Sequence, residues 1–166
     1  MIKVAILYNS FTGNTEKTAG YIKEGLCQAG DIDVRLMKLN GDVPLDAAFI
    51  AESSAVIIGT PTYHASMCWQ LKKIFDTDRS LNFSGKLGGA FSTARYIHGG
   101  GDIAIKDVLQ YLLCAGMLVY SAGASLGAPV IHMGPVAIEG KLEESGDLFK
   151  LYGKRFGEKA LEVFGV

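Results

Sequence analysis

Apolar residues along this chain follow two patterns that alternate with each other. Short apolar runs are typical of buried strands and predict strands over residues 2–7, 33–37, 55–59, 87–93 and 117–120. Between these runs, apolar residues recur every three or four positions, which predicts helices. The helical stripes are Ala19, Ile22, Leu26 and Ala29; Met67, Leu71, Ile74 and Phe75; Ile105, Val108, Leu109 and Leu112; and Leu148, Leu151, Tyr152, Phe156, Ala160 and Val163, with a further short helix over residues 46–52.

Strands that alternate strictly with helices predict a parallel sheet covered by helices on both faces. No internal repeat, low-complexity tract or linker interrupts the pattern, and 166 residues is an ordinary length for one domain. We therefore expect a single α/β domain over residues 1–166, built on a doubly wound sheet of five strands. In such sheets, ligands bind outside the carboxyl ends of the strands, where the strand order reverses.

The loop after the first strand has the composition of an anion site. Ser10, Thr12 and Thr15 supply three hydroxyls, and a helix is expected to begin near Gly13 or Asn14. The free N–H groups and the positive dipole end of that helix favour a phosphate. A nucleoside-triphosphate loop would need a lysine before the threonine, and a dinucleotide fingerprint would need three glycines. The loop therefore suits a phosphate monoester, and the alternative is an ordinary Ser/Thr helix cap without a ligand.

Two further loops follow the third and fourth strands. The first contains a Thr-Pro pair, which stiffens the turn, and places Tyr63 and His64 at its tip, where an aromatic ring can stack on a flat ligand. The second contains three consecutive glycines, Gly99 to Gly101, and each costs about 0.5–1 kcal/mol relative to alanine. We expect them where backbone lies against a ligand or forms a mobile lid. Asp102 is expected to cap the next helix.

Composition and charge exclude several classes of protein. The formal net charge of −1 leaves no electrostatic footprint for nucleic acid. No apolar run approaches the roughly 18 residues of a membrane span, and the first residues lack the flanks of a signal peptide, so we expect a cytoplasmic protein. Cys27, Cys68 and Cys114 have no paired spacing and are expected to be buried or half-buried. The three histidines have no ligand spacing, so no metal site is expected.

With these segments identified, the chain resembles the flavodoxin-like family over essentially its full length. The resemblance is best in residues 10–15, Ser-Phe-Thr-Gly-Asn-Thr, which have the form of the family's FMN-phosphate loop. The other two loops look more like those of WrbA-type NAD(P)H:quinone oxidoreductases and NADPH-dependent FMN reductases than those of small electron-carrier flavodoxins. The resemblance implies the strand order 2-1-3-4-5 and FMN as the cofactor.

The resemblance also implies which residues contact FMN. Those expected to bind the phosphate are Ser10, Thr12, Gly13, Asn14 and Thr15. Those expected to flank the isoalloxazine ring are Pro61, Thr62, Tyr63 and His64. Those expected along the ring edge and the ribityl chain are Ser92, Thr93, Ala94, Arg95, Gly99, Gly100, Gly101 and Asp102. No side chain is expected to act as a general acid or base, because the cofactor carries the chemistry.

The activity implied by the resemblance is hydride transfer from NAD(P)H to flavin N5, followed by transfer to an acceptor such as a quinone. Arg95 and His98 are candidates for attracting the phosphates of the nicotinamide cofactor, and the alternative is that both are solvated loop residues. The chain lacks much of the quinone reductases' insertion after the second strand, and it has Cys114 and Ala115 where they tend to have histidines. These departures weaken the case for quinone specificity and for their tetramer, and the expected assembly is a homo-oligomer, dimer or tetramer.

Three other functions are compatible with parts of the pattern. A flavodoxin that shuttles electrons between proteins is the main alternative, but such carriers are usually strongly acidic, unlike this chain. A phosphoryl-accepting receiver domain would need an aspartate at the end of the third strand, where Gly59 and Thr60 stand. An FMN-binding sensor or chaperone remains open on sequence alone.

Overall fold

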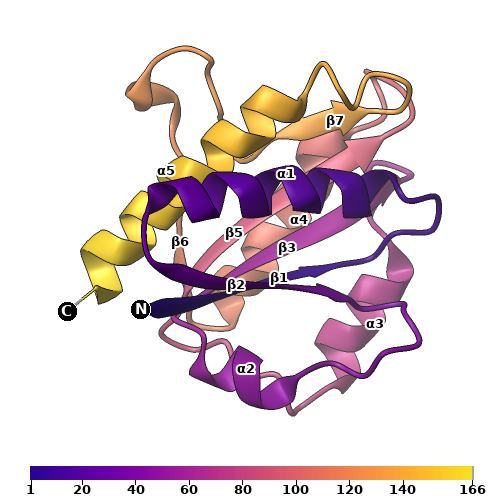
Figure 1. Cartoon of the computed structure of the whole chain (residues 1–166). Helices are drawn as coiled ribbons and strands as arrows, with labels where there is room; N and C mark the ends of the chain where they lie inside the picture. The colour runs from indigo at the N-terminus through magenta and orange to yellow at the C-terminus, as the bar shows by residue number, and fades with distance from the viewer. Residues whose placement is uncertain (166) are drawn as a thin grey trace.

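The computed structural model describes residues 1–165, which form three layers, a central parallel sheet between two groups of helices (Figure 1). The principal strands lie in the order β2-β1-β3-β5-β6, which is 2-1-3-4-5 when these five alone are counted, so the expected doubly wound fold is confirmed. The strands are β1 (Ile2–Tyr8), β2 (Ile32–Lys38), β3 (Ala55–Tyr63), β4 (Ser66–Met67), β5 (Leu87–Ala94), β6 (Leu118–Val119) and β7 (Val136–Ile138). The helices are α1 (Asn14–Ala29), α2 (Ala47–Glu52), α3 (Trp69–Thr77), α4 (Gly101–Cys114), the 3-10 turn η1 (Ala124–Leu126) and α5 (Gly146–Phe164).

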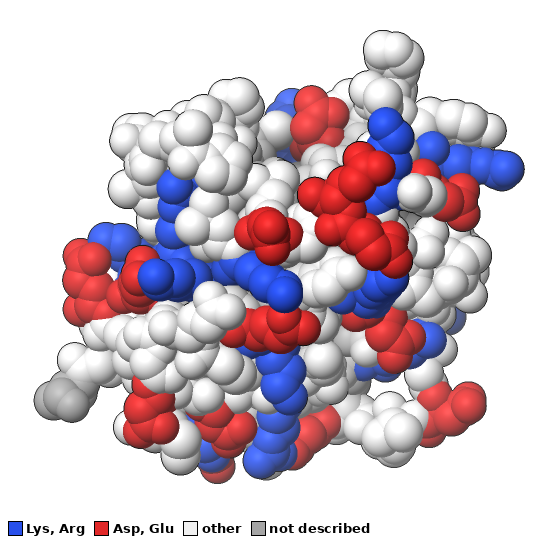
Figure 2. Space-filling model, turned by 45° about the horizontal axis from the view of Figure 1, so that its top comes forward, with Lys and Arg blue, Asp and Glu red and all other residues white. Residues whose placement is uncertain are grey.

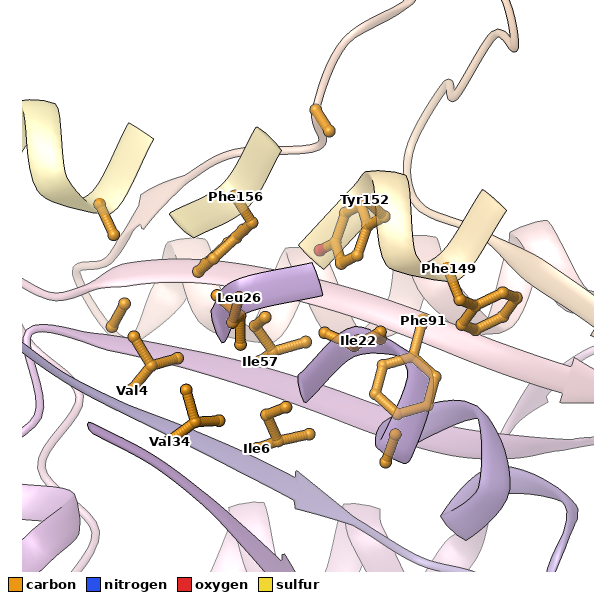
Figure 3. Packing of buried hydrophobic residues seen from close by; sticks show 14 of the residues in the cluster. Val4, Ile6, Ile22, Leu26, Val34, Ile57, Phe91, Phe149, Tyr152 and Phe156 are labelled. Atoms are coloured by element: carbon orange, nitrogen blue, oxygen red, sulfur yellow. The ribbon is translucent and has the colours of Figure 1, made fainter. Parts of the chain in front are cut away.

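The two faces of the sheet bury two separate apolar clusters. Along β1, Val4 and Ile6 belong to the cluster under α1 and α5, whereas Ala5 and Leu7 belong to the cluster under α2, α3 and α4. Figure 3 shows the first cluster, in which Val4 and Ile6 lie below side chains of α1 and α5. Because both faces are buried, the central strands read as continuous apolar runs.

Glycines let α1 and α5 approach each other at backbone distance. A Cβ atom on Gly25 of α1 would lie 2.0 Å from the carbonyl oxygen of Lys150 in α5. Reciprocally, a Cβ atom on Gly153 of α5 would lie 2.2 Å from the carbonyl oxygen of Ile22 in α1. No other residue type fits at either position without separating the helices.

The edge of the sheet next to β5 differs from the expectation of one fifth strand over residues 117–120. Only Leu118 and Val119 pair with β5 there, opposite its first residues Leu87 and Gly88. The other end of β5 pairs in parallel with β7, a strand that the sequence analysis did not predict. The fifth position in the sheet is therefore shared by two short strands, and the intervening loop leaves the sheet.

Two boundaries around the third loop also differ from expectation. β3 continues past Gly59 to Tyr63, with Pro61 paired opposite Thr93. α3 begins at Trp69 and not at Met67, because Met67 pairs with Thr62 in the short antiparallel strand β4. The segment expected to be a turn is thus an extension of the sheet beyond its core.

Cys68 is buried as expected, but Cys27 and Cys114 are exposed, so the expectation for these two residues was wrong. Both lie outside the buried stripes of their helices, to which the nearby and fully buried Leu26 and Leu112 belong. Among the described residues, no helix combines the length and apolar character needed to cross a bilayer.

The contact between α1 and α5 gives a direct test of the fold. We expect Gly25→Ala to lower the free energy of unfolding by about 1–3 kcal/mol, because the added methyl group overlaps a carbonyl oxygen. Gly20→Ala in the same helix is the matched control, since no atom lies within 4 Å of a Cβ there. That variant should gain about 0.5–1 kcal/mol from helix propensity. Urea denaturation measures both, and equal effects in the two variants would contradict the close packing.

Candidate functional site

The loops that follow β1, β3 and β5 meet at the carboxyl edge of the sheet. Together they enclose a cavity of about 190 Å³. Its lining residues are Thr12 and Asn14 from the first loop and helix, Pro61, Thr62 and Tyr63 from β3, Thr93, Ala94 and Arg95 from β5 and its loop, and Glu139 after β7. The first eight of these were predicted from the sequence as FMN contacts, and they come from all three loops.

The first loop is ordered by hydrogen bonds of its own. The Ser10 hydroxyl accepts from the backbone N–H of Glu16 at 3.2 Å, which satisfies one free amide of the first turn of α1. The backbone of Ser10 pairs with the Asn40 side chain, donating to Oδ1 at 3.0 Å and accepting from Nδ2 at 3.2 Å. Gly13 has φ +89° and is the last residue before the helix. Ser10 and Gly13 therefore shape the loop but do not line the cavity.

A buried hydrogen bond joins the first and third loops. The hydroxyl oxygens of Thr15 and Thr93 lie 2.8 Å apart, and both residues are buried. Thr93 lines the cavity, while Thr15 lies behind it. Because these residues are 78 positions apart in the chain, the bond fixes the two loops relative to each other.

The loop between β3 and β4 is a tight hairpin. Thr62 pairs with Met67 and Tyr63 with Ser66, so His64 and Ala65 alone form the turn, with φ +49° and +56°. Turns of this type favour asparagine and glycine, because both central residues need positive φ. Tyr63 is exposed, but it is the last residue of β3 and not part of the loop tip, where the sequence analysis placed it. The His64 side chain is at the tip and does not line the cavity.

Contacts with α4 support the hairpin. The Ser66 hydroxyl donates to the Asp107 carboxylate at 2.6 Å. The turn also packs against Gly100, where a Cβ atom would lie 2.5 Å from the Cβ of Ala65. The hairpin that carries Tyr63 is therefore anchored to the helix beside it.

The three glycines of the third loop have packing partners within the protein. Gly100 has φ +78° and is the N-cap of α4, so the expectation that Asp102 caps this helix was wrong. A Cβ on Gly101 would lie 2.5 Å from Val136 of β7, and the Ser92 hydroxyl donates to the Gly101 carbonyl at 2.8 Å. Ser92 and residues 99–102 do not line the cavity, and their expected contact with FMN stays a prediction.

One lining residue, Glu139, was not predicted. Its carboxylate pairs with the Arg95 guanidinium at 3.4 Å, and its backbone N–H donates to the Ala94 carbonyl at 2.9 Å. The only sequence signal for it was the short apolar run that forms β7, which lies in a glycine-rich segment. The ion pair leaves the cavity rim close to neutral.

Two polar groups of the hairpin suit a flat ligand with hydrogen-bonding edges. The Thr62 hydroxyl oxygen is buried without a hydrogen-bond partner, although it lines the cavity. An unpaired buried hydroxyl costs about 1–3 kcal/mol, so a ligand that pairs with it is favoured. Partial burial raises the pKa of the Tyr63 hydroxyl, which therefore stays protonated at neutral pH and keeps its donor. The centroids of the Phe11 and Tyr63 rings lie 6.1 Å apart, so Phe11 lies beside the aromatic residue that lines the cavity.

Comparison with known proteins assigns the family. Residues 2–128 match the family model for NADPH-dependent FMN reductase. The chain belongs to this family. The FMN reductase match confirms the resemblance and the FMN cofactor expected from the sequence.

Relatives of this FMN reductase family member are named either flavodoxin or NAD(P)H dehydrogenase (quinone). A flavodoxin from Clostridium saccharobutylicum is 42% identical over 98% of this chain and 100% of its own length. An NAD(P)H dehydrogenase (quinone) from Chromohalobacter salexigens is 30% identical over 72% of this chain and 70% of its own length. A WrbA-like flavodoxin structure from Agrobacterium tumefaciens superposes with a TM-score of 0.80 at 23% identity, covering 98% of this chain and 99% of that one, which supports the fold.

The bond between the two threonines predicts an energetic coupling between the loops. We expect Thr15→Val and Thr93→Val each to destabilise the FMN-free protein, and the double variant to lose less than the sum. The coupling energy should be about 0.5–1.5 kcal/mol, the net value of one hydrogen bond. Chemical denaturation of the four proteins measures it, and strictly additive losses would show that the hydroxyls do not interact.

Proposed function

We propose that this protein binds FMN in the cavity formed by the three loops and transfers electrons from NAD(P)H, through the flavin, to a small acceptor such as a quinone. One observation carries the proposal. Thr12, Thr62 and Thr93 come from three different loops and line the same cavity, which lies beside the N-terminus of α1. The FMN reductase family supports the reaction class.

In this assignment each loop has a distinct part. The N–H groups at the start of α1 and the Thr12 hydroxyl bind the phosphate, since a helix N-terminus favours an anion. Tyr63 lies against the ring, with Phe11 beside it, and together they keep water from one side of the site. The unpaired Thr62 hydroxyl donates to, or accepts from, a polar atom of the flavin. Bound FMN supplies the hydride and electron chemistry.

The charges at the rim of the cavity affect which electron acceptor the protein favours. Arg95 and Glu139 form an ion pair, so the rim presents no excess of negative charge that would attract a basic protein partner. On the face shown in Figure 2, acidic and basic side chains are interspersed, in keeping with the formal net charge of −1. A small neutral acceptor suits such a surface better than a basic protein partner does.

A second candidate function is electron transfer between proteins, as in a flavodoxin. The observation that favours it is the 42% identity to the flavodoxin from Clostridium saccharobutylicum over nearly the whole chain. The two functions use the same cofactor site and differ in whether NAD(P)H reduces the flavin directly.

The phosphate assignment is tested with Thr12→Val. Loss of a hydrogen bond to a charged group costs about 1.5–3 kcal/mol, so the Kd for FMN should rise about tenfold to a hundredfold. Riboflavin, which lacks the phosphate, is the matched ligand control and should bind both proteins equally. Fluorescence titration of the flavin measures both affinities. If Thr12→Val weakens riboflavin as much as FMN, the hydroxyl does not contact the phosphate.

The reaction class is tested by mixing FMN-saturated protein with NADH or NADPH without oxygen. We expect the flavin absorption to bleach rapidly and to recover on addition of a quinone. Flavin that stays yellow with both nucleotides would overturn the reductase and leave the electron carrier as the function.

A further inference from the structure

Two charged side chains line the cavity formed by the three loops. Arg95 directly follows β5, and Glu139 directly follows β7. Their charged groups lie 3.4 Å apart. Within residues 1–165, the other residues of the lining carry no formal charge: Thr12, Asn14, Pro61, Thr62, Tyr63, Thr93 and Ala94. Among the lining residues, this pair is therefore the source of the charge that acts on a ligand in the cavity.

The sheet holds Glu139 beside the cavity independently of the ion pair. Its backbone N–H donates to the Ala94 carbonyl at 2.9 Å, next to the pairing of Ile138 with Ala94 in the β5–β7 ladder. The N–H of Lys141 donates to the Ile138 carbonyl at 2.9 Å, which closes a turn around Glu139. The backbone of Glu139 therefore keeps its place when the Arg95 side chain moves or is replaced.

The two charges differ in how strongly water screens them. The Arg95 side chain is 74% exposed, against 47% for Glu139. The Arg95 guanidinium also lies 5.6 Å from the ring of Tyr96, an exposed residue of the loop. Charges in contact with water act more weakly on their surroundings than charges that are partly covered. Although the formal charges of the pair sum to zero, each acts on a bound ring with its own strength, and the Glu139 charge is the less screened of the two.

We propose that Glu139 and Arg95 set the reduction potential of the bound flavin, with the Glu139 carboxylate opposing reduction and the Arg95 guanidinium favouring it. The hydride that NAD(P)H gives up in the proposed function brings two electrons and one proton, so the ring gains one negative charge. A nearby carboxylate disfavours that charge, and a nearby guanidinium stabilises it. The inference rests on the proposed function, because it concerns flavin bound in this cavity.

Glu139 lies outside the segment of the chain that matches the family model, which ends at residue 128. The family assignment therefore gives this residue no role. Its charge comes from the strand that returns to the sheet as β7, whereas the phosphate loop lies within the matched segment. A substitution at residue 139 can thus alter the potential without any change in the loop that is proposed to bind the phosphate.

The test is a spectroelectrochemical titration of the FMN-loaded protein and of three variants, Glu139→Gln, Arg95→Gln and Glu52→Gln. Glutamine keeps the size of the Glu139 side chain and can still accept a hydrogen bond from Arg95, so this variant removes the charge and little else. Glu52→Gln is the matched control. Glu52 is also paired with a cation, Lys3, but it ends α2 just before β3 begins, at the opposite edge of the sheet from the cavity.

We expect Glu139→Gln to raise the midpoint potential and Arg95→Gln to lower it. Each should change the ratio of the dissociation constants of reduced and oxidised FMN about threefold to tenfold, which is about 15–30 mV for a two-electron couple. Glu52→Gln should have the potential of the parent protein. The shifts should shrink between about 0.1 M and 1 M salt, because the screening length falls from about 10 Å to about 3 Å.

Two results would overturn the inference. One is a shift in Glu139→Gln no larger than that in Glu52→Gln. The other is a shift of the same sign in both cavity variants, which would point to altered packing and not to charge. Arg95→Gln gives the sign even if Glu139→Gln fails to fold, because the Arg95 side chain is mostly exposed.

The measurement also separates this inference from the proposed reductase activity, because an electrode replaces the nicotinamide as the source of electrons. Opposite shifts in the two cavity variants would support the inference even if neither NADH nor NADPH bleaches the flavin. Bleaching by a nicotinamide together with unshifted potentials would overturn the inference and leave the reductase intact. A protein that binds no FMN would overturn both.

Discussion

The parallel alignment of β1, β3 and β5 is the constraint on which the site depends. Tyr8 pairs with Gly59, and Gly59 pairs with Phe91, so the three strands reach the same edge of the sheet together. Gly59 also lets the Phe91 ring lie across the strand, since a Cβ there would be 2.2 Å from that ring. Backbone pairing thus brings together loops that are distant in sequence, independently of contacts between the side chains of these loops.

Continuous apolar runs made the core strands predictable, because strands buried on both faces carry few polar residues. The order of the strands was expected from the family resemblance. The strands at the edge of the sheet were harder to predict from the sequence. β7 is three residues long and follows a glycine-rich segment, so it has too little periodicity to be recognised alone. Glu139 was missed for the same reason, since its place at the cavity depends on that strand. Asp102 was misjudged because the N-cap is Gly100, two residues earlier, which has the positive φ of a left-handed conformation.

The glycines of the third loop show how one sequence signal can have two physical causes. A run of three glycines suggested backbone lying against a ligand, but in the structure Gly100 and Gly101 are needed where Ala65 and Val136 approach them. These contacts link the hairpin, α4 and β7 into one support for the cavity. The cavity is therefore shaped largely by packing between residues that do not line it.

The division of the outer strand between β6 and β7 has a consequence for how this architecture can change. The segment between the two strands leaves the sheet after Val119 and returns at Val136, while β5 keeps a pairing partner at both ends. The length of this segment therefore does not fix the position of Glu139, which is set by β7. Insertions or deletions in its exposed part, residues 124–130, can remodel the outer surface of the molecule during evolution without displacing the residues that line the cavity, whereas Ala122 and Ile131 on either side are buried in the core.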